Sequence, residues 1–177
     1  MKTRSLILSM AIIFSANIAL FSQEGESQSY KNNNTKYGVG GQFTTPVFGL
    51  SGIMDINETI SAQAIIGFLG DLFMIGGKGL YRFNKDKYWN IYGYGLIGPS
   101  WYTTDKYNST ARTYEEITES NIMFGGGAGF EYNWKALSEN LPDLFWNIEL
   151  GFGILSFDET DYDISGITFG AGVNYRF

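Results

Sequence analysis

The residues with the clearest potential for catalysis in this chain are two glutamates. Glu131 and Glu149 could in principle act as the acid and the base of a glycoside hydrolase, which needs two carboxyl groups around one bond. The chain of 177 residues contains no histidine and no cysteine, which excludes imidazole bases, disulfides and cysteine-based metal sites. We therefore favour structural ion pairs for both glutamates, and we expect no catalytic residue, no cofactor and no resident metal.

Two glycine-rich segments and one acidic segment could in principle bind phosphate or a cation. Segments 76–79 and 125–129 contain the glycines of a phosphate-binding loop but not its spacing, and neither leads from a strand into a helix. Glycine on the inner face of a tightly curved sheet explains both segments better. Four acids near the C-terminus could collect calcium, although we favour a solvated acidic loop: Asp158, Glu159, Asp161 and Asp163.

The composition excludes several classes of protein. Hydrophobic residues make up 44% of the chain, which rules out disorder as its main state. Charged residues make up 17%, below the roughly 25% of an ordinary soluble domain. The net charge of −6 gives no basic footprint, so we expect no nucleic-acid partner.

The N-terminal segment has the pattern of a secretory signal peptide. Lys2 and Arg4 precede an apolar run over 6–14, and small and polar residues follow it. This run is shorter than the roughly 18 apolar residues of a membrane-spanning helix. We place cleavage near Ser22. The sequence then divides into a cleaved signal peptide at 1–22, a flexible polar leader at 23–35 and a single domain at 36–177.

From residue 36 onward, apolar residues recur with a period of two, which indicates β-strands. Short polar turns join most strands, and we expect longer polar loops at 103–118 and 157–163. The pattern predicts an all-β fold, an eight-stranded antiparallel up-and-down β-barrel. The eight expected strands are 36–45, 46–56, 60–69, 73–83, 88–102, 119–134, 144–156 and 164–177.

Side-chain volume decides whether the apolar faces of the strands point into the barrel or away from it. The interior of an eight-stranded barrel is just wide enough to be filled by side chains, and the apolar faces carry far too many large residues to fit there. The opposite faces are mostly glycine, serine, asparagine and glutamine with a few charges, which suits a crowded interior. We therefore predict a transmembrane barrel with its apolar face outward. A soluble exported, lipocalin-like carrier of a hydrophobic ligand is the alternative.

Aromatic residues near the strand ends predict girdles at the two membrane interfaces. Trp89 and Trp101 lie on one face of the same strand, about 30 Å apart along the barrel axis at a tilt of about 40°. That separation is close to the height of a membrane-facing apolar band. The principal girdle residues are Trp89, Trp101, Trp134, Trp146 and Tyr175, with Tyr81, Phe83, Tyr132 and Phe177 at the end of the termini and Phe43, Phe48, Phe68 and Phe73 at the opposite end.

Six charged residues face the lumen of this predicted barrel: Asp55, Lys78, Arg82, Glu131, Glu149 and Arg176. They are three acids and three bases, and an unpaired charge in a narrow lumen is costly. We therefore predict that they pair with one another and plug the pore, whereas a narrow porin-like channel for small solutes is the alternative. Five amides are expected to complete the hydrogen bonds: Gln42, Gln63, Asn133, Asn147 and Asn174.

The C-terminal segment carries a resemblance to a known family. Phe177 ends the chain, with Tyr175, Val173 and Phe169 alternating behind it, and this resembles the C-terminal recognition strand of bacterial outer-membrane barrel proteins. The chain from residue 23 resembles the small eight-stranded OmpA/OmpX-like barrels. The resemblance implies an outer-membrane location with periplasmic termini and a structural or surface-interaction role. It also implies contact with membrane lipid and lipopolysaccharide and insertion by the barrel assembly machinery, and it leaves the surface ligand unspecified.

Overall fold

The computed structural model describes residues 36–177 except 85, 87, 109–112 and 158–161. The expected signal peptide (1–22) and flexible leader (23–35) lie outside the described residues. Within the described part of the chain, no helix is long and apolar enough to cross a membrane.

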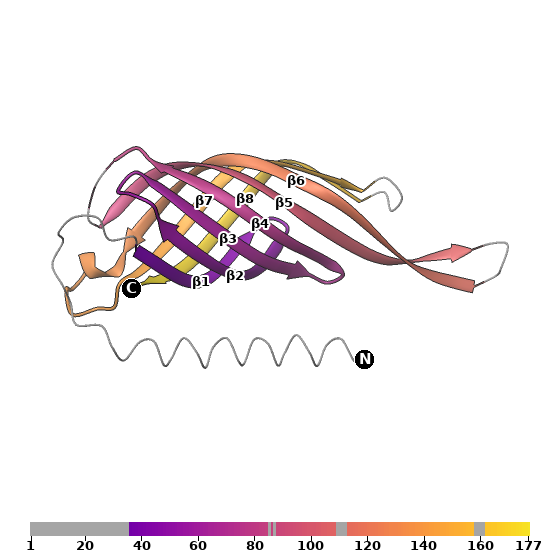
Figure 1. The fold of residues 1–177 in the computed structure, drawn as a ribbon, viewed down its shortest axis with the longest axis horizontal. Coiled ribbons are helices and arrows are strands. Elements are labelled where there is room, and N and C mark those ends of the chain that lie inside the picture. The colour runs from indigo at the N-terminus through magenta and orange to yellow at the C-terminus, as the bar shows by residue number, and fades with distance from the viewer. Residues whose placement is uncertain (1–35, 85, 87, 109–112, 158–161) are drawn as a thin grey trace. The chain divides into compact units, whose positions relative to one another are not determined.

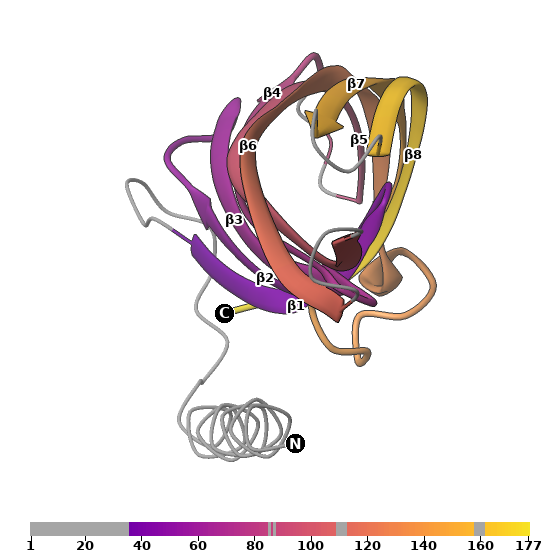
Figure 2. The same ribbon diagram turned by 90° about the vertical axis from the view of Figure 1, so that its right-hand side faces the viewer.

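Eight antiparallel strands form a closed ring in which each strand pairs with the next and β1 pairs with β8 (Figure 1). The ring is seen nearly end-on in Figure 2. A short 3-10 helix, η1 (Trp134–Ala136), follows β6. The predicted eight-stranded antiparallel barrel is thus confirmed. The strands are β1 (Lys36–Thr44), β2 (Val47–Asp55), β3 (Ile60–Leu69), β4 (Leu72–Arg82), β5 (Trp89–Asn108), β6 (Thr113–Asn133), β7 (Leu144–Phe157) and β8 (Tyr162–Arg176).

Short turns hold neighbouring strands in register. We call the end of the barrel where β1 begins and β8 ends the termini end, and the opposite end the loop end. At the termini end, Asn57 Oδ1 accepts hydrogen bonds from the backbone N–H groups of Thr59 and Ile60, both at 2.8 Å. At the loop end, Gly70 has a φ of 59° between β3 and β4, a left-handed conformation that glycine adopts readily. These turns determine which residues of adjacent strands face inward together.

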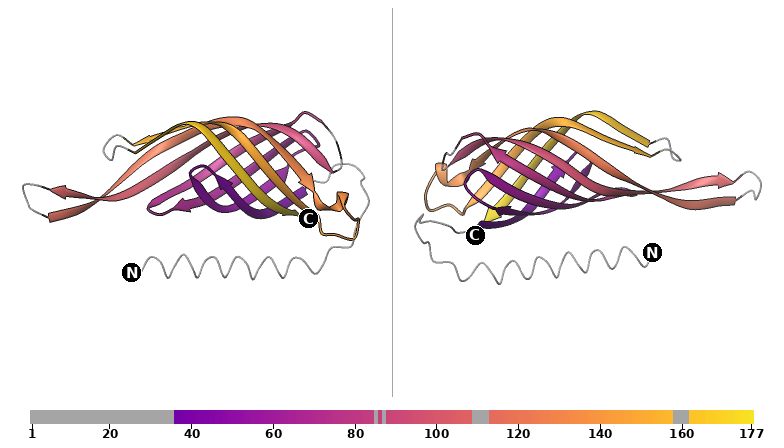
Figure 3. Two further views of the ribbon diagram at one scale, coloured as in Figure 1. Left: turned by 180° about the vertical axis from the view of Figure 1, so that it is seen from behind. Right: turned by 45° about the horizontal axis from the view of Figure 1, so that its top comes forward.

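The segments 103–118 and 157–163 are not simply loops, which corrects the prediction. β5 and β6 extend into the first segment, over 103–108 and 113–118, as a two-stranded ribbon that projects beyond the barrel wall, with Thr103 opposite Thr118 (Figures 1 and 3). β7 and β8 likewise extend into the second segment. The alternation of apolar and polar residues ends where the chain leaves the barrel, but backbone pairing continues because threonine, tyrosine and isoleucine favour strands.

The outer surface of the barrel is apolar, as predicted. Phe124, Ile148 and Phe169 are 52%, 52% and 60% exposed, and they point away from the barrel axis. In each of these strands, the residues that alternate with the outward-facing ones point inward and are largely buried. A lipocalin-like carrier would need a polar outer face, so this surface argues against that alternative.

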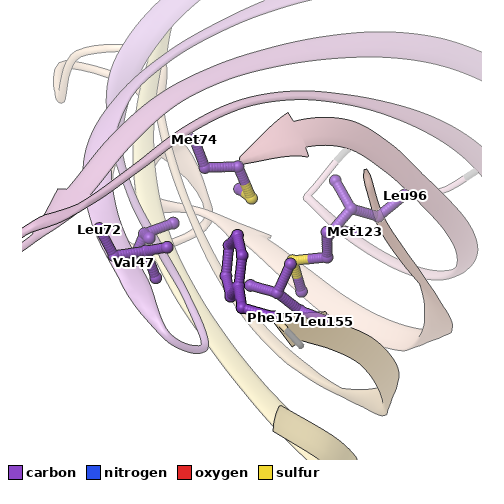
Figure 4. Packing of buried hydrophobic residues seen from close by; sticks show 7 residues of the cluster. All are labelled: Val47, Leu72, Met74, Leu96, Met123, Leu155 and Phe157. Carbon is purple, nitrogen blue, oxygen red and sulfur yellow. The ribbon is translucent and has the colours of Figure 1, made fainter. Parts of the chain in front are cut away.

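The inside of the barrel is less uniformly polar than predicted. Charges and amides fill the half at the termini end, whereas apolar side chains form a buried cluster at the loop end (Figure 4). The alternation did not reveal them because the strands there are apolar on both faces, as in the run Leu72 to Ile75. The cluster contains Val47, Leu72, Met74, Leu96, Met123, Leu155 and Phe157.

Candidate functional site

The six charged residues predicted to face the lumen all lie inside the barrel. Their side chains are at most 13% exposed. Each has the inward position in the alternation of its strand, so the pleat of the sheet brings them together. They come from five strands: Asp55 from β2, Lys78 and Arg82 from β4, Glu131 from β6, Glu149 from β7 and Arg176 from β8.

Four of these residues form a closed ring of ion pairs near the termini end, which we call the termini ring: Asp55, Arg82, Glu131 and Arg176. Arg82 Nη2 is 2.9 Å from Asp55 Oδ1, and Arg82 Nε is 2.7 Å from Glu131 Oε1. Arg176 Nη2 is 2.7 Å from Glu131 Oε2, and Arg176 Nη1 is 3.4 Å from Asp55 Oδ2. Each acid therefore has two bases as partners, and the charges of the ring sum to zero.

The other two charges form a second ion pair deeper in the barrel, which we call the central pair: Lys78 and Glu149. Lys78 Nζ is 2.5 Å from Glu149 Oε2, and both side chains are completely buried. Lys78 Nζ also donates to Thr44 Oγ1 at 3.1 Å and lies 4.9 Å from the centre of the Tyr94 ring. The Tyr92 hydroxyl donates to Glu149 Oε1 at 3.0 Å. The surrounding contacts thus compensate for removing both charges from water.

Amide side chains surround the central pair. Gln42 Nε2 donates to Glu149 Oε2 at 3.3 Å, and Asn147 Nδ2 donates to the Tyr92 hydroxyl at 3.0 Å. Three of the five predicted amides therefore gather here, because Gln63 also donates to Gln42 Oε1 at 3.5 Å. The remaining two form other hydrogen bonds: Asn174 accepts from Ser51, and Asn133 donates to Asp143.

The prediction missed four residues that form hydrogen bonds with the buried charges, and one of them is Thr44, which accepts from Lys78. Asn90 Nδ2 donates to Glu131 Oε1 at 3.1 Å, and Ser61 Oγ donates to Asp55 Oδ1 at 2.6 Å. The Tyr92 hydroxyl is also a donor in the network, to Glu149. All four have the inward position of their strands, and this was the signal that could have found them.

The arrangement of the two glutamates explains why an ion-pair role suits them better than catalysis. Glu131 accepts charge-assisted hydrogen bonds from Arg82 and Arg176, and Glu149 accepts one from Lys78. A catalytic carboxyl group must reach a substrate bond, whereas the side chains of both glutamates are buried and already bound by bases. The geometry therefore supports two structural anchors inside the barrel.

The glycine-rich segments do not form the phosphate-binding loops that were considered for them. Residues 76–79 lie within β4 and residues 125–129 lie within β6, so neither segment is a loop. Among the residues that the structure describes, no three acidic side chains are grouped to hold a metal ion. Asp163 lies in β8, and the other three acids lie outside the described residues: Asp158, Glu159 and Asp161.

Outward-facing aromatic residues form a continuous row across five strands near the loop end. Each residue of the row lies directly opposite the next in the register of the sheet. The last two rings, of Phe73 and Trp101, have centroids 5.6 Å apart. The row lies where a girdle was expected, and its contact with a membrane interface stays a prediction. Its members are Phe43, Phe48, Phe68, Phe73 and Trp101.

A second group of aromatic residues lies at the termini end. Tyr132 is opposite Trp89 on one side and Trp146 on the other, and its ring centroid is 5.8 Å from that of Trp146. Trp134 lies outside the strands as the first residue of η1, and it is 41% exposed. These rings lie where a girdle was expected, and their contact with a membrane interface stays a prediction.

The C-terminal segment closes the barrel against β1. The backbone N–H of Phe177 donates to Tyr37 O at 2.8 Å, and Tyr37 N donates back to Phe177 O at 3.3 Å. Phe169, Val173 and Phe177 face outward and are exposed, and the ring of Tyr175 stacks on that of Phe177 with centroids 6.3 Å apart. The proposed recognition residues thus form one accessible outer face. Their recognition by the barrel assembly machinery stays a prediction.

A closed eight-stranded barrel with an apolar outside and paired charges inside has the features of a membrane-spanning barrel. The model of the outer membrane protein beta-barrel domain matches residues 10–177. The chain belongs to this outer-membrane barrel family. The family match places the barrel in the outer membrane, as the resemblance implied. No curated protein is similar enough in sequence to count as a match.

The solved structures that are similar to this chain include other outer-membrane proteins. The chain is similar to the N-terminal β-barrel domain of Pseudomonas aeruginosa OprF, with a TM-score of 0.51 and 14% identity over 83% of this chain and 100% of that one. It is also similar to neisserial surface protein A, with a TM-score of 0.45 and 13% identity over 81% and 96% of the two chains. The attachment invasion locus protein Ail of Yersinia pestis gives a TM-score of 0.42 and 14% identity over 81% and 97%.

Proposed function

We propose that this outer-membrane barrel is a structural and surface-interaction protein with a closed lumen and no catalytic activity. The burial of three groups of side chains inside the barrel is the observation that carries this proposal. The termini ring, the central pair and the apolar cluster lie at successive levels along the lumen, which supports a closed interior. An interior occupied by packed side chains leaves no continuous aqueous path, which an open porin requires.

The orientation and partners follow from the same architecture. We propose that the termini end faces the periplasm, because bacterial barrels have short periplasmic turns and longer extracellular hairpins. The apolar wall would contact membrane lipid, and the loop end would contact lipopolysaccharide. The barrel assembly machinery would recognise the outward face of the C-terminal segment, composed of Phe169, Val173, Tyr175 and Phe177.

A closed lumen predicts that the barrel does not conduct ions. The purified full-length protein, folded in detergent and added to planar bilayers, should give no steady single-channel conductance, because charged and apolar side chains fill the lumen. Folding is verified separately by a band shift between unboiled and boiled samples on gels. Steady unitary currents from the folded protein would contradict the closed lumen and support a narrow porin-like channel.

The projecting ribbon of β5 and β6 supports the surface-interaction part of the proposal. Within the described residues, the register of β5 with β4 ends at Tyr102, and the register of β6 with β7 begins only at Phe124. Beyond these points the ribbon has two open edges, which can accept an extended segment of another protein. The described part of the ribbon is acidic, so we propose a basic partner segment. Its charged residues are Asp105, Lys106, Glu115, Glu116 and Glu119.

Shortening the ribbon tests this part of the proposal. A variant in which 104–117 is replaced by an Asn-Gly turn should fold normally, because the barrel register lies outside that segment. Its affinity for a fluorescent poly-lysine peptide should fall at least about tenfold relative to the full chain. Poly-glutamate of equal length is the control ligand and should bind neither protein. Equal poly-lysine affinities would refute the ribbon as the binding surface.

A further inference from the structure

An apolar cluster lies inside the barrel at the loop end. We call it the apolar plug: Val47, Leu72, Met74, Leu96, Met123, Leu155 and Phe157. These side chains come from β2, β4, β5, β6 and β7, and none is more than 5% exposed. In Figure 4 the ring of Phe157 lies between Val47 and Leu72 on one side and Leu155 and Met123 on the other. The Tyr102 ring packs against it, with centroids 5.8 Å apart.

Glycines in the wall show that the plug fills the space around it. A Cβ atom added to Gly76 would lie 3.1 Å from Leu96 Cδ1 and 3.3 Å from Met74 Cε. A Cβ atom added to Gly153 would lie 3.4 Å from Met123 Cε. These separations leave less than a methyl group of free space between the plug and two parts of the wall. A hydrated ion would have to displace the plug to pass it.

The plug and the ion pairs resist an ion in different ways. The plug side chains carry no oxygen or nitrogen that could replace the water around an ion. The free-energy cost of dehydrating an ion at this level is therefore not compensated by the protein. The termini ring has such atoms, and its charges can exchange partners because each acid already contacts two bases. Near the central pair, Gln63 Oε1 and Asn147 Oδ1 accept no hydrogen bond from the described residues, so water is their natural partner. The polar levels therefore tolerate water. At the plug level the wall carries the Ser100 hydroxyl, opposite Met74 and without a partner among the described residues, but the plug side chains themselves exclude water.

We propose that the apolar plug, rather than the ion pairs, is the barrier that closes the lumen to ions. This inference rests on the proposed closed lumen and identifies the level that closes it. The termini ring and the central pair then act mainly as internal braces between strands. Current through the barrel is controlled at the loop end, where the hydrophobic constriction lies.

Three variants in planar bilayers test this assignment. The plug variant, L96A/M123A/F157A, removes apolar bulk and should give steady unitary currents at least about tenfold above the wild-type background. The polar variant, K78M/E149Q, removes both charges of the central pair at nearly constant volume and should stay within about twofold of that background. The matched control, I97A/F124A/I154A, removes outward-facing apolar bulk from the same three strands and should be silent.

The outcomes separate this inference from the proposed function. Steady currents from the wild-type protein would overturn the closed lumen itself. If the wild type and a correctly folded plug variant are both silent, the role of the plug as the barrier is refuted and the closed lumen still stands. Equal currents from the polar variant and the plug variant would refute that role in the same way. If the plug variant shows no band shift on gels, M74Q/M123Q keeps side-chain length while supplying amide oxygens. That variant should also conduct, and its silence when folded would overturn the inference.

Discussion

Replacing Lys78 by methionine should lower the free energy of unfolding by about 3–5 kcal/mol, the range expected when one partner of a buried ion pair is removed. The substitution leaves the Glu149 carboxylate buried without the ammonium group that lies 2.5 Å from it. Tyr92 and Gln42 still donate to that carboxylate, but neither carries a positive charge. Equilibrium unfolding in urea, with the protein folded into lipid vesicles, measures the difference.

Two control variants distinguish this cause from lost packing. K78M/E149Q should recover most of the stability, since no uncompensated charge remains in the barrel. K135M breaks a more exposed pair, in which Lys135 Nζ is 3.5 Å from Asp143 Oδ2, and should cost at most about 1 kcal/mol. A double variant as unstable as K78M would show that the methionine fits badly and that the charge is not the cause.

Replacing Leu150 by arginine should destabilise the barrel by about 2–4 kcal/mol, the cost of a cation at the bilayer midplane. Leu150 lies near the middle of β7, faces outward and is 56% exposed, with Ala128 and Phe169 as its neighbours in the register. Its side chain therefore faces the centre of the apolar band. Urea unfolding in lipid vesicles, compared with the wild type, gives the magnitude.

Position along the strand provides the control for this second prediction. Tyr37 also faces outward, but it lies one residue after the start of β1 at the termini end. An arginine there reaches the headgroup region, so Y37R should cost about 0–1 kcal/mol. Equal costs at the two positions would mean that the barrel wall does not lie across a bilayer as the family membership requires.

The alternation of inward and outward side chains along each strand explains what could be predicted from the sequence. One alternating pattern identifies both the exposed Phe124 and the buried Glu131, because they lie on opposite faces of β6. Partners are harder to predict, because they depend on register between strands far apart in the chain. Lys78 and Glu149 are separated by 71 residues, and nothing local to either residue indicates that the two groups meet.

The pattern fails where both faces of a strand have the same character. Met74 and Ile75 are both apolar, but only Met74 faces inward, so composition alone does not show that the lumen is apolar at that level. The projecting ribbon presents the opposite case, since both of its faces are largely polar. Backbone pairing between Thr103 and Thr118 is invisible to an argument from hydrophobic alternation.

The termini ring draws one residue from each even-numbered strand, β2, β4, β6 and β8. All seven strands from β2 to β8 are needed to bring the four charges together. Until β8 docks, Asp55 and Glu131 share a single guanidinium, that of Arg82, and one negative charge is left in excess. Arg176, the last residue of β8, supplies the second cation. Its contact with Glu131 needs only β8 beside β7, whereas its contact with Asp55 reaches across β1 and forms only when the seam between β8 and β1 is closed. The ring of ion pairs is therefore complete only in the closed barrel, where it ties the two ends of the sheet together.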